Sequence, residues 1–322
     1  MDQSDFYPEK PILEVTQTKR KKSQLIVSMV LFFALFFVFF QANFLFVTQL
    51  IFVLFIHELG HLLVMKYYRY ENVRMLFIPM MGAFVSGKKD NYSQKESLLV
   101  VAAGPIPGFL IGILLLLIAA SVHSAILVDF GLLFLFLNYI NLLPLYPLDG
   151  GQFVQIIVKR FNDYFTFVFE FISSLLFIGI GWYIDSWLMM LFGFYMGFRV
   201  HSIQSLLAVR KELDEEGIEY RSSYAELSKK NYAGIRAKLL EKSKTLRSYM
   251  DMVETEEGNQ LLAKQVQSIL KNAIDYNASL FLKLFLILTW IAILLSPILV
   301  YLFFKEDLIS SYGWYINTLS SK

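Results

Sequence analysis

The sequence predicts an all-α polytopic membrane protein with six to seven transmembrane helices, a membrane-associated β-hairpin and a small cytoplasmic helical domain. Hydrophobic residues make up 56% of the 322 residues and charged residues only 17%, whereas soluble proteins contain about 25% charged residues. Apolar runs of about 20 residues, the length that crosses a bilayer, recur along the chain. The polar residues concentrate in one long stretch near the C-terminal end.

The composition also excludes several kinds of site. The chain contains no cysteine, which removes disulfides, thiolate nucleophiles and cysteine metal ligands. Its net charge is +2, and no basic run is interleaved with aromatic residues, so we expect no nucleic-acid partner. Any metal ion must therefore be held by nitrogen and oxygen ligands.

Seven apolar segments indicate membrane-spanning helices. We expect them at residues 25–42, 44–67, 96–121, 125–143, 164–184, 187–201 and 280–304. Residues 72–95 are too polar and too short for another crossing. The β-branched and aromatic residues around Pro79 and Gly82 predict instead a hairpin that dips into the membrane face, where protein must shield its backbone.

The distribution of Lys and Arg orients these segments and divides the chain into five parts. Lys19 to Lys22 precede the first span, which places the N-terminus in the cytoplasm. The predicted parts are a cytoplasmic N-terminal tail (1–24), a transmembrane core (25–201), a cytoplasmic helical region (202–279), a C-terminal transmembrane helix (280–304) and an external tail (305–322).

The region 202–279 is rich in charged residues and has apolar residues at helical spacing. This pattern predicts two or three amphipathic helices, broken near Gly217 and Gly258. A solvated helical linker is favoured over a dedicated sensor or substrate-gating domain.

The second apolar segment carries the sequence His57-Glu58-Leu59-Gly60-His61. Residues four apart lie on one face of a helix, so both imidazoles can reach one ion, and Glu58 lies beside them. This spacing is typical of zinc metalloproteases, in which the glutamate is the general base. A carboxylate inside a bilayer is costly unless it is paired or catalytic, which favours a metal site over a chance match.

A third protein ligand is expected, because a catalytic zinc ion usually takes three. Without cysteine the candidates are His, Asp or Glu. His123 is predicted on the far side of the membrane and His201 at the end of a span. Asp149 lies on the same side as the end of the second span, after a segment broken by Pro144 and Pro147. We therefore predict that His57, His61 and Asp149 bind the metal ion.

His57–His61 together with the segment Asn141-Leu-Leu-Pro-Leu-Tyr-Pro-Leu-Asp-Gly-Gly151 resembles the site-2 protease family of intramembrane zinc metalloproteases. That family combines HExxH on one transmembrane helix with an N-x-x-P-x-x-x-L-D-G segment that supplies the third ligand. The resemblance covers about residues 44–155. Pro79-Met-Met-Gly82-Ala-Phe84 is similar to the membrane-dipping hairpin of the family, and Ala103-Gly104-Pro105 to a short motif that opens the next core helix.

This resemblance implies Zn²⁺ as the cofactor and Glu58 as the catalytic base. It implies that Asn141 contacts the substrate backbone, although a helix cap or an interhelical hydrogen bond explains Asn141 nearly as well. Gly82, Ala83 and Phe84 of the hairpin are expected to bind substrate by strand addition. The implied substrate is a membrane protein in the lipid bilayer, either a single-span regulator or a signal-peptide remnant.

The resemblance further implies regulated intramembrane proteolysis in a multi-pass protein of the cell membrane, most simply a bacterial plasma membrane. The active site would face the cytoplasmic side. Two alternatives stay open. One is a membrane HExxH protease of the HtpX type, whose third ligand is a glutamate on a later helix. The other is a transporter that uses the two histidines and Glu58 as a metal or proton relay.

Overall fold

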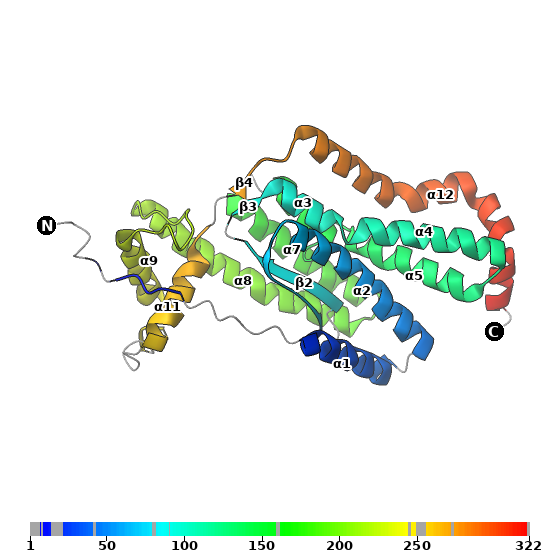
Figure 1. The fold of residues 1–322 in the computed structure, drawn as a ribbon, viewed down its shortest axis with the longest axis horizontal. Helices are drawn as coiled ribbons and strands as arrows, with labels where there is room; N and C mark the ends of the chain where they lie inside the picture. Colours follow the sequence, from blue (N-terminus) through cyan, green and yellow to red (C-terminus); the bar gives the residue numbers. More distant parts are fainter. Residues whose placement is uncertain are drawn as a thin grey trace. The chain divides into compact units, whose positions relative to one another are not determined.

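The computed structural model describes residues 7, 9–13, 22–40, 43–78, 82–89, 91–158, 162–243, 246–248, 256–271 and 274–320. The described chain is mostly helical (Figure 1). The helices are α1 (Lys22–Phe40), α2 (Phe44–Tyr67), α3 (Gln94–Ala102), α4 (Pro105–Val122), α5 (Ala125–Asn141), α6 (Asp149–Val158), α7 (Asn162–Tyr183), α8 (Trp187–Glu215), α9 (Lys229–Lys242), α11 (Glu256–Ile269) and α12 (Leu280–Ser320). The strands are β1 (Glu71–Ile78), β2 (Gly82–Lys88), β3 (Tyr92–Ser93) and β4 (Ile274–Asp275).

Four helical stretches are long and apolar enough to cross a membrane, judged by length and composition among the described residues. They are Phe44–Tyr67, Gln94–Val122, Asp163–Tyr183 and Leu280–Leu299. Gln24–Val38 and Ala125–Asn141 are shorter apolar helices. A multi-pass membrane protein with a small two-stranded hairpin is therefore supported, and the total of six to seven spans stays a prediction.

Several helix ends differ from the expected positions. The segment expected as one helix at 96–121 consists of α3 and α4, because Pro105 lacks an N–H and begins a new helix. The helices expected to end at 201 and 304 continue to Glu215 and Ser320. An apolar run shows where a chain is hydrophobic, and helical structure continues beyond it into polar sequence.

The breaks expected in the polar region agree only in part with the structure. Gly217, with φ +67°, follows the end of α8, where a left-handed residue commonly ends a helix. Gly258 lies inside α11, near its start. Residues 251–255, which precede α11, fall outside the described part of the chain.

The chain divides into two compact units, which we describe separately. The first unit contains Met1–Lys19, Asp90–Tyr92 and Phe161–Asp275. The second contains Arg20–Lys89, Ser93–Arg160 and Tyr276–Lys322.

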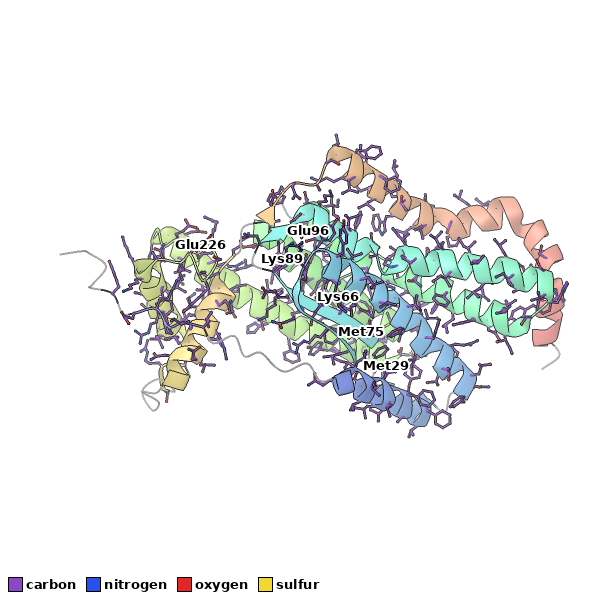
Figure 2. The ribbon with its side chains drawn as sticks, viewed as in Figure 1. Met29, Lys66, Met75, Lys89, Glu96 and Glu226 are labelled. Carbon is purple, nitrogen blue, oxygen red and sulfur yellow. The ribbon has the colours of Figure 1, made fainter. Side chains whose placement is uncertain are left out.

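In the second unit, α1 and α2 pack against the predicted hairpin. Strands β1 and β2 are antiparallel, with Leu76 opposite Phe84 and Ile78 opposite Gly82. Phe32 of α1 is buried against Met75 and Phe77 of β1. Met29 of α1 packs against this cluster, which includes Met75 of β1; both are labelled in Figure 2. The tip residues 79–81, which include Pro79 of the predicted hairpin, fall outside the described residues.

Three further helices of this unit surround α2. Helices α4 and α5 form an antiparallel pair (Figure 1). A Cβ atom on Gly112 would lie 3.1 Å from the Gly131 carbonyl oxygen, so small residues let these helices approach closely, as is common in membranes. Apolar side chains of α3, α6, α12 and the segment just before α12 form another cluster, made of Leu98, Val101, Phe153, Ala278 and Leu286.

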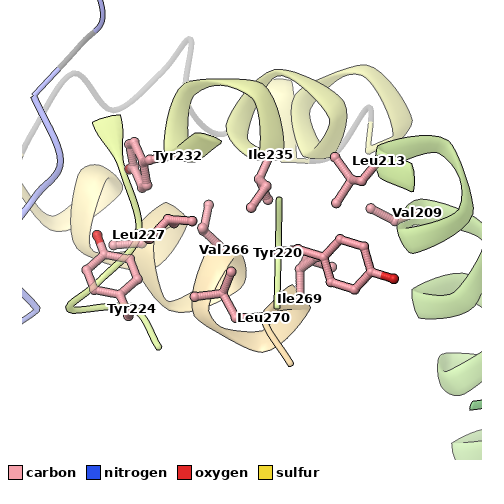
Figure 3. Close-up of a cluster of buried hydrophobic side chains, with 11 residues drawn as sticks. Val209, Leu213, Tyr220, Tyr224, Leu227, Tyr232, Ile235, Val266, Ile269 and Leu270 are labelled. Carbon is pink, nitrogen blue, oxygen red and sulfur yellow. The ribbon is translucent and has the colours of Figure 1, made fainter. Parts of the chain in front are cut away.

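The first unit combines an apolar helix pair with a polar helical region. Ser174 of α7 donates a hydrogen bond to the Gly193 carbonyl of α8 (2.8 Å), and buried Glu170 pairs with Arg199 (3.4 Å). The C-terminal part of α8 packs with α9 and α11 around a buried apolar core (Figure 3). That core consists of Val209, Leu213, Tyr220, Tyr224, Leu227, Tyr232, Ile235, Ala263, Val266, Ile269 and Leu270.

Candidate metal centre

Helix α2 presents two histidines toward one point. His57 and His61 are one helical turn apart, and both are buried. Their Nε2 atoms lie 3.2 Å apart. Neither ring is free to turn, because each Nδ1 atom has its own partner on another helix.

His61 is fixed by backbone. Its Nδ1 lies 2.7 Å from the Val100 carbonyl oxygen of α3. A carbonyl oxygen can only accept a hydrogen bond, so Nδ1 carries the proton. In the neutral ring, Nε2 is then left with a lone pair that points toward His57.

His57 is fixed in the same way by Asn138 of α5. Its Nδ1 lies 2.8 Å from Asn138 Oδ1. The amide Nδ2 of Asn138 donates to the Phe134 carbonyl (2.7 Å), so the amide group can only turn its oxygen toward His57. His57 Nδ1 is therefore a donor, and its Nε2 also carries a lone pair.

Asp149, the first residue of α6, completes the group. Its Oδ2 lies 2.9 Å from His57 Nε2 and 3.3 Å from His61 Nε2. Three buried atoms with lone pairs therefore meet, and with neutral rings none of them has a proton to share. One proton could satisfy a single pair of these atoms, whereas a metal ion accepts lone pairs from all three.

The spacing of the three atoms fits a small cation. Zinc bonds of about 2.0–2.2 Å in tetrahedral geometry place two ligand atoms roughly 3.3–3.5 Å apart. The three observed separations are 2.9, 3.2 and 3.3 Å. Among the residues that the structure describes, this is the one group of three or more acidic or histidine side chains close enough to share an ion.

Glycines make room for this group. A Cβ on Gly104 would lie 2.3 Å from His61 Nε2 and 2.8 Å from His57 Nε2. A Cβ on Gly60 would lie 1.9 Å from the Ala103 carbonyl oxygen, so α2 touches the junction of α3 and α4 directly. Gly104 thus leaves open the space into which the lone pairs point.

The start of α6 is also packed tightly. A Cβ on Gly150 would lie 2.1 Å from the Leu142 carbonyl oxygen, and one on Gly151 would lie 2.4 Å from the Leu145 carbonyl. These two glycines let the helix begin against the loop that precedes it. That contact positions Asp149 beside α2.

Glu58 lies next to the group and faces the hairpin. It is buried, and its carboxylate accepts a hydrogen bond from the Val85 backbone N–H of β2. Val85 is opposite Met75, two positions from the pair Phe77 and Ala83. The Phe77 N–H points to Ser28 Oγ of α1 (3.2 Å).

These two amides define which edge of the hairpin is covered. Residues two apart in a strand direct their N–H groups to the same side. At both pairs the N–H groups therefore point away from the partner strand, the Phe77 N–H toward α1 and the Val85 N–H toward Glu58. The outer edge of β2 faces the candidate site.

The other predicted site residues lie as follows. Asn141 Nδ2 donates to the Leu137 carbonyl of its own helix (3.1 Å). Gly82, with φ +92°, begins β2, and Ala83 and Phe84 follow within the strand. His123 and His201 do not join the metal-binding group of the described residues.

Sequence reasoning missed Asn138, Val100 and the role of Gly104. An asparagine inside an apolar helix was a usable signal for Asn138, because a polar side chain in a membrane needs a partner. The contribution of Val100 is a backbone carbonyl, which leaves no mark in the sequence.

Comparisons with known proteins match part of the chain to a peptidase family. The model of Peptidase family M50 matches residues 45–127. The zinc metalloprotease MJ0392 of Methanocaldococcus jannaschii is 32% identical over 114 residues, 34% of this chain and 33% of that protein. Stage IV sporulation protein FB of Bacillus subtilis is 26% identical over 113 residues, 34% of this chain and 39% of that protein.

One solved structure is also similar, the site-2 protease from Methanocaldococcus jannaschii. It has a TM-score of 0.43 and 24% identity, and the match covers 55% of this chain and 88% of that one. The matched segments span between a third and two fifths of the length of the two curated relatives.

The apolar helices support a multi-pass membrane protein, and the three convergent side chains form a candidate metal-binding site. The family and relative matches confirm the resemblance to the site-2 protease family. The segment matched by the family model contains His57, Glu58 and His61 and ends before Asp149.

We expect the substitution Gly104→Ala to lower the bound metal at least tenfold. The backbone of Gly104 (φ −75°, ψ −66°) suits any L-residue, so the effect would come from the added Cβ alone. Metal content per purified protein, measured by mass spectrometry, tests this. Gly179→Ala in α7 is the control, because a Cβ there would meet no atom within 4 Å. Equal metal content in both variants would contradict the expectation.

The substitution Asn138→Leu should weaken metal binding by about 10- to 100-fold, the usual effect of losing a partner of a metal-binding histidine. Competition with a chelator measures it. Asn141→Leu is the matched control, since the Asn141 side chain bonds to its own helix, and it should leave metal affinity unchanged. A similar loss in both variants would show that Asn138 has no special role.

Proposed function

We propose that this protein is a zinc metalloprotease that hydrolyses a peptide bond in or beside a transmembrane segment of a membrane-protein substrate. His57, His61 and Asp149 would hold the ion, and Glu58 would act as the general base. The observation that carries the proposal is the meeting of three lone-pair atoms beside a buried glutamate on an apolar helix. The name of the matched zinc metalloprotease supports zinc as the metal.

The chemistry divides between the ion and the chain. When bound, zinc supplies Lewis-acid activation of water and of the scissile carbonyl. Glu58 accepts a proton from the attacking water as the water oxygen bonds to the carbonyl carbon. Glu58 then gives this proton to the amine nitrogen as the C–N bond breaks. One water is consumed, and Glu58 ends in its starting state.

Substrate presentation is proposed to use the hairpin. A helical substrate hides its carbonyl groups, so it must unwind before it is cut. The outer edge of β2 lies beside Glu58, where the Val85 N–H faces the carboxylate, and an extended segment could pair with this edge along Gly82, Ala83 and Phe84. Asn141 is proposed to contact the same backbone segment.

The setting of the reaction is part of the proposal. Lys and Arg positions support an active site toward the cytoplasmic side of the cell membrane. A single-span regulatory protein or a signal-peptide remnant fits regulated intramembrane proteolysis. The alternative with a glutamate as third ligand is not favoured, because among the described residues the candidate metal-binding group contains Asp149 and no glutamate.

The substitution Glu58→Gln should abolish cleavage, by a factor of about 10² or more, while zinc content stays near one per chain. The glutamine keeps the size of the side chain but cannot take the proton. Cleavage of a single-span reporter protein in vesicles, together with zinc analysis, tests both parts. Continued cleavage by this variant would remove the proposed base, and zinc transport without cleavage would favour the transporter alternative.

Strand addition can be tested by disulfide trapping, because the chain has no cysteine of its own. In the Glu58→Gln background, Phe84→Cys should cross-link to a cysteine placed in the unwound substrate segment, since side chains on neighbouring strands lie about 5 Å apart. Leu76→Cys is the matched control: it is opposite Phe84 but one strand further from the outer edge. Equal cross-linking from both positions would contradict strand addition at the outer edge of β2.

A further inference from the structure

The segment of residues 9–13, Glu-Lys-Pro-Ile-Leu, lies on the polar helical region of the first unit (Figure 1). It has no helical or strand structure of its own. Its contacts nevertheless involve side chains and backbone of three different parts of that region. This segment is more than 200 residues away along the chain from the residues that hold it.

Lys10 is the centre of these contacts. Its ammonium group donates to the carbonyl oxygens of Tyr224 (2.8 Å), Ala225 (3.1 Å) and Leu227 (2.9 Å). The same nitrogen lies 5.1 Å from the centre of the Tyr224 ring. An ammonium group has three donors, and all three are used here. Its burial lowers the pKa of Lys10, and the three carbonyl dipoles favour its charged form.

The residues after Lys10 continue the interaction. The Tyr224 hydroxyl donates to the Pro11 carbonyl (2.9 Å), and Gln260 Nε2 of α11 donates to the Ile12 carbonyl (2.7 Å). Leu13 packs against the buried core of Figure 3. Ile12 is 89% exposed, so the segment is held by the side chains of Lys10 and Leu13 and by the backbone carbonyls of Pro11 and Ile12.

We propose that the turn at residues 224–227 and Gln260 form a lysine-selective docking site, and that its occupant is the segment 9–13 of the same chain. A primary ammonium group directs its donors as a tripod toward three carbonyl oxygens, whereas the guanidinium group of arginine is a flat fork. Selectivity for lysine therefore follows from the arrangement of the carbonyls. This inference is independent of the proposed proteolytic activity.

Spin labels on the full-length protein test the docking. Cysteines at Ile12 and at exposed Gln267 of α11 would be the only two in the chain, and pulsed electron resonance gives the distribution of distances between their labels. We expect a narrow distribution with Lys10 present and a distribution at least twice as broad in Lys10→Met and in Lys10→Arg. Lys230→Met, which removes an exposed lysine from the start of α9, should leave it narrow.

Hydrogen exchange of α9 and α11 in the same variants separates loss of docking from unfolding. Protection of these helices should stay unchanged in Lys10→Arg while the distances spread. A narrow distribution in Lys10→Met would overturn the docking site. A narrow distribution in Lys10→Arg alone would overturn its selectivity for lysine, and broadening in Lys230→Met as well would show a general effect of charge.

Discussion

The candidate site depends on two hydrogen bonds that fix the imidazole rings of His57 and His61. One ends on the Val100 carbonyl and the other on the Asn138 amide. Because both bonds use Nδ1–H, both Nε2 lone pairs point at Asp149 Oδ2. Three lone pairs facing each other away from water repel, and a cation among them would relieve this repulsion. The rest of the core can be understood as the structure that brings these groups together.

Close contacts between helices bring the two histidines, their hydrogen-bond partners and Asp149 together. The three candidate ligands and the hydrogen-bond partners of the two histidines come from α2, α3, α5 and α6, so four helices must approach one point. Gly60 and Gly104 let the junction of α3 and α4 reach α2, and Gly108 leaves space for the Asn138 amide, which a Cβ would meet at 2.3 Å. In a membrane, where lipid tails are as apolar as leucine, packing of small residues and polar contacts hold helices together. The glycines therefore serve both the fold and the site.

The sequence alone predicted two kinds of feature: side chains at helical spacing, and charged groups that are costly to bury. The i, i+4 spacing of His57 and His61 and the buried charge of Glu58 were visible without any structure. Asp149 could be found because few ligands remained in a chain without cysteine. Asn138 was not found, because its function depends on the rotation of α5 against α2. The break between α3 and α4 lies within one apolar stretch, which hydrophobicity alone reads as continuous.

The hairpin shows how a backbone pattern links the fold to the proposed chemistry. Along β1 and β2, backbone N–H groups point alternately toward and away from the partner strand. At the pairs Phe77 with Ala83 and Met75 with Val85 they point away from it. On β1 this edge is covered by α1, where Ser28 accepts from Phe77. On β2 the same alternation directs the Val85 N–H toward Glu58. A shift of register by one residue would exchange inward and outward amides. It would remove the Val85 contact and turn other backbone groups toward Glu58, so the surroundings of the proposed base and the outward edge of β2 are set by one register.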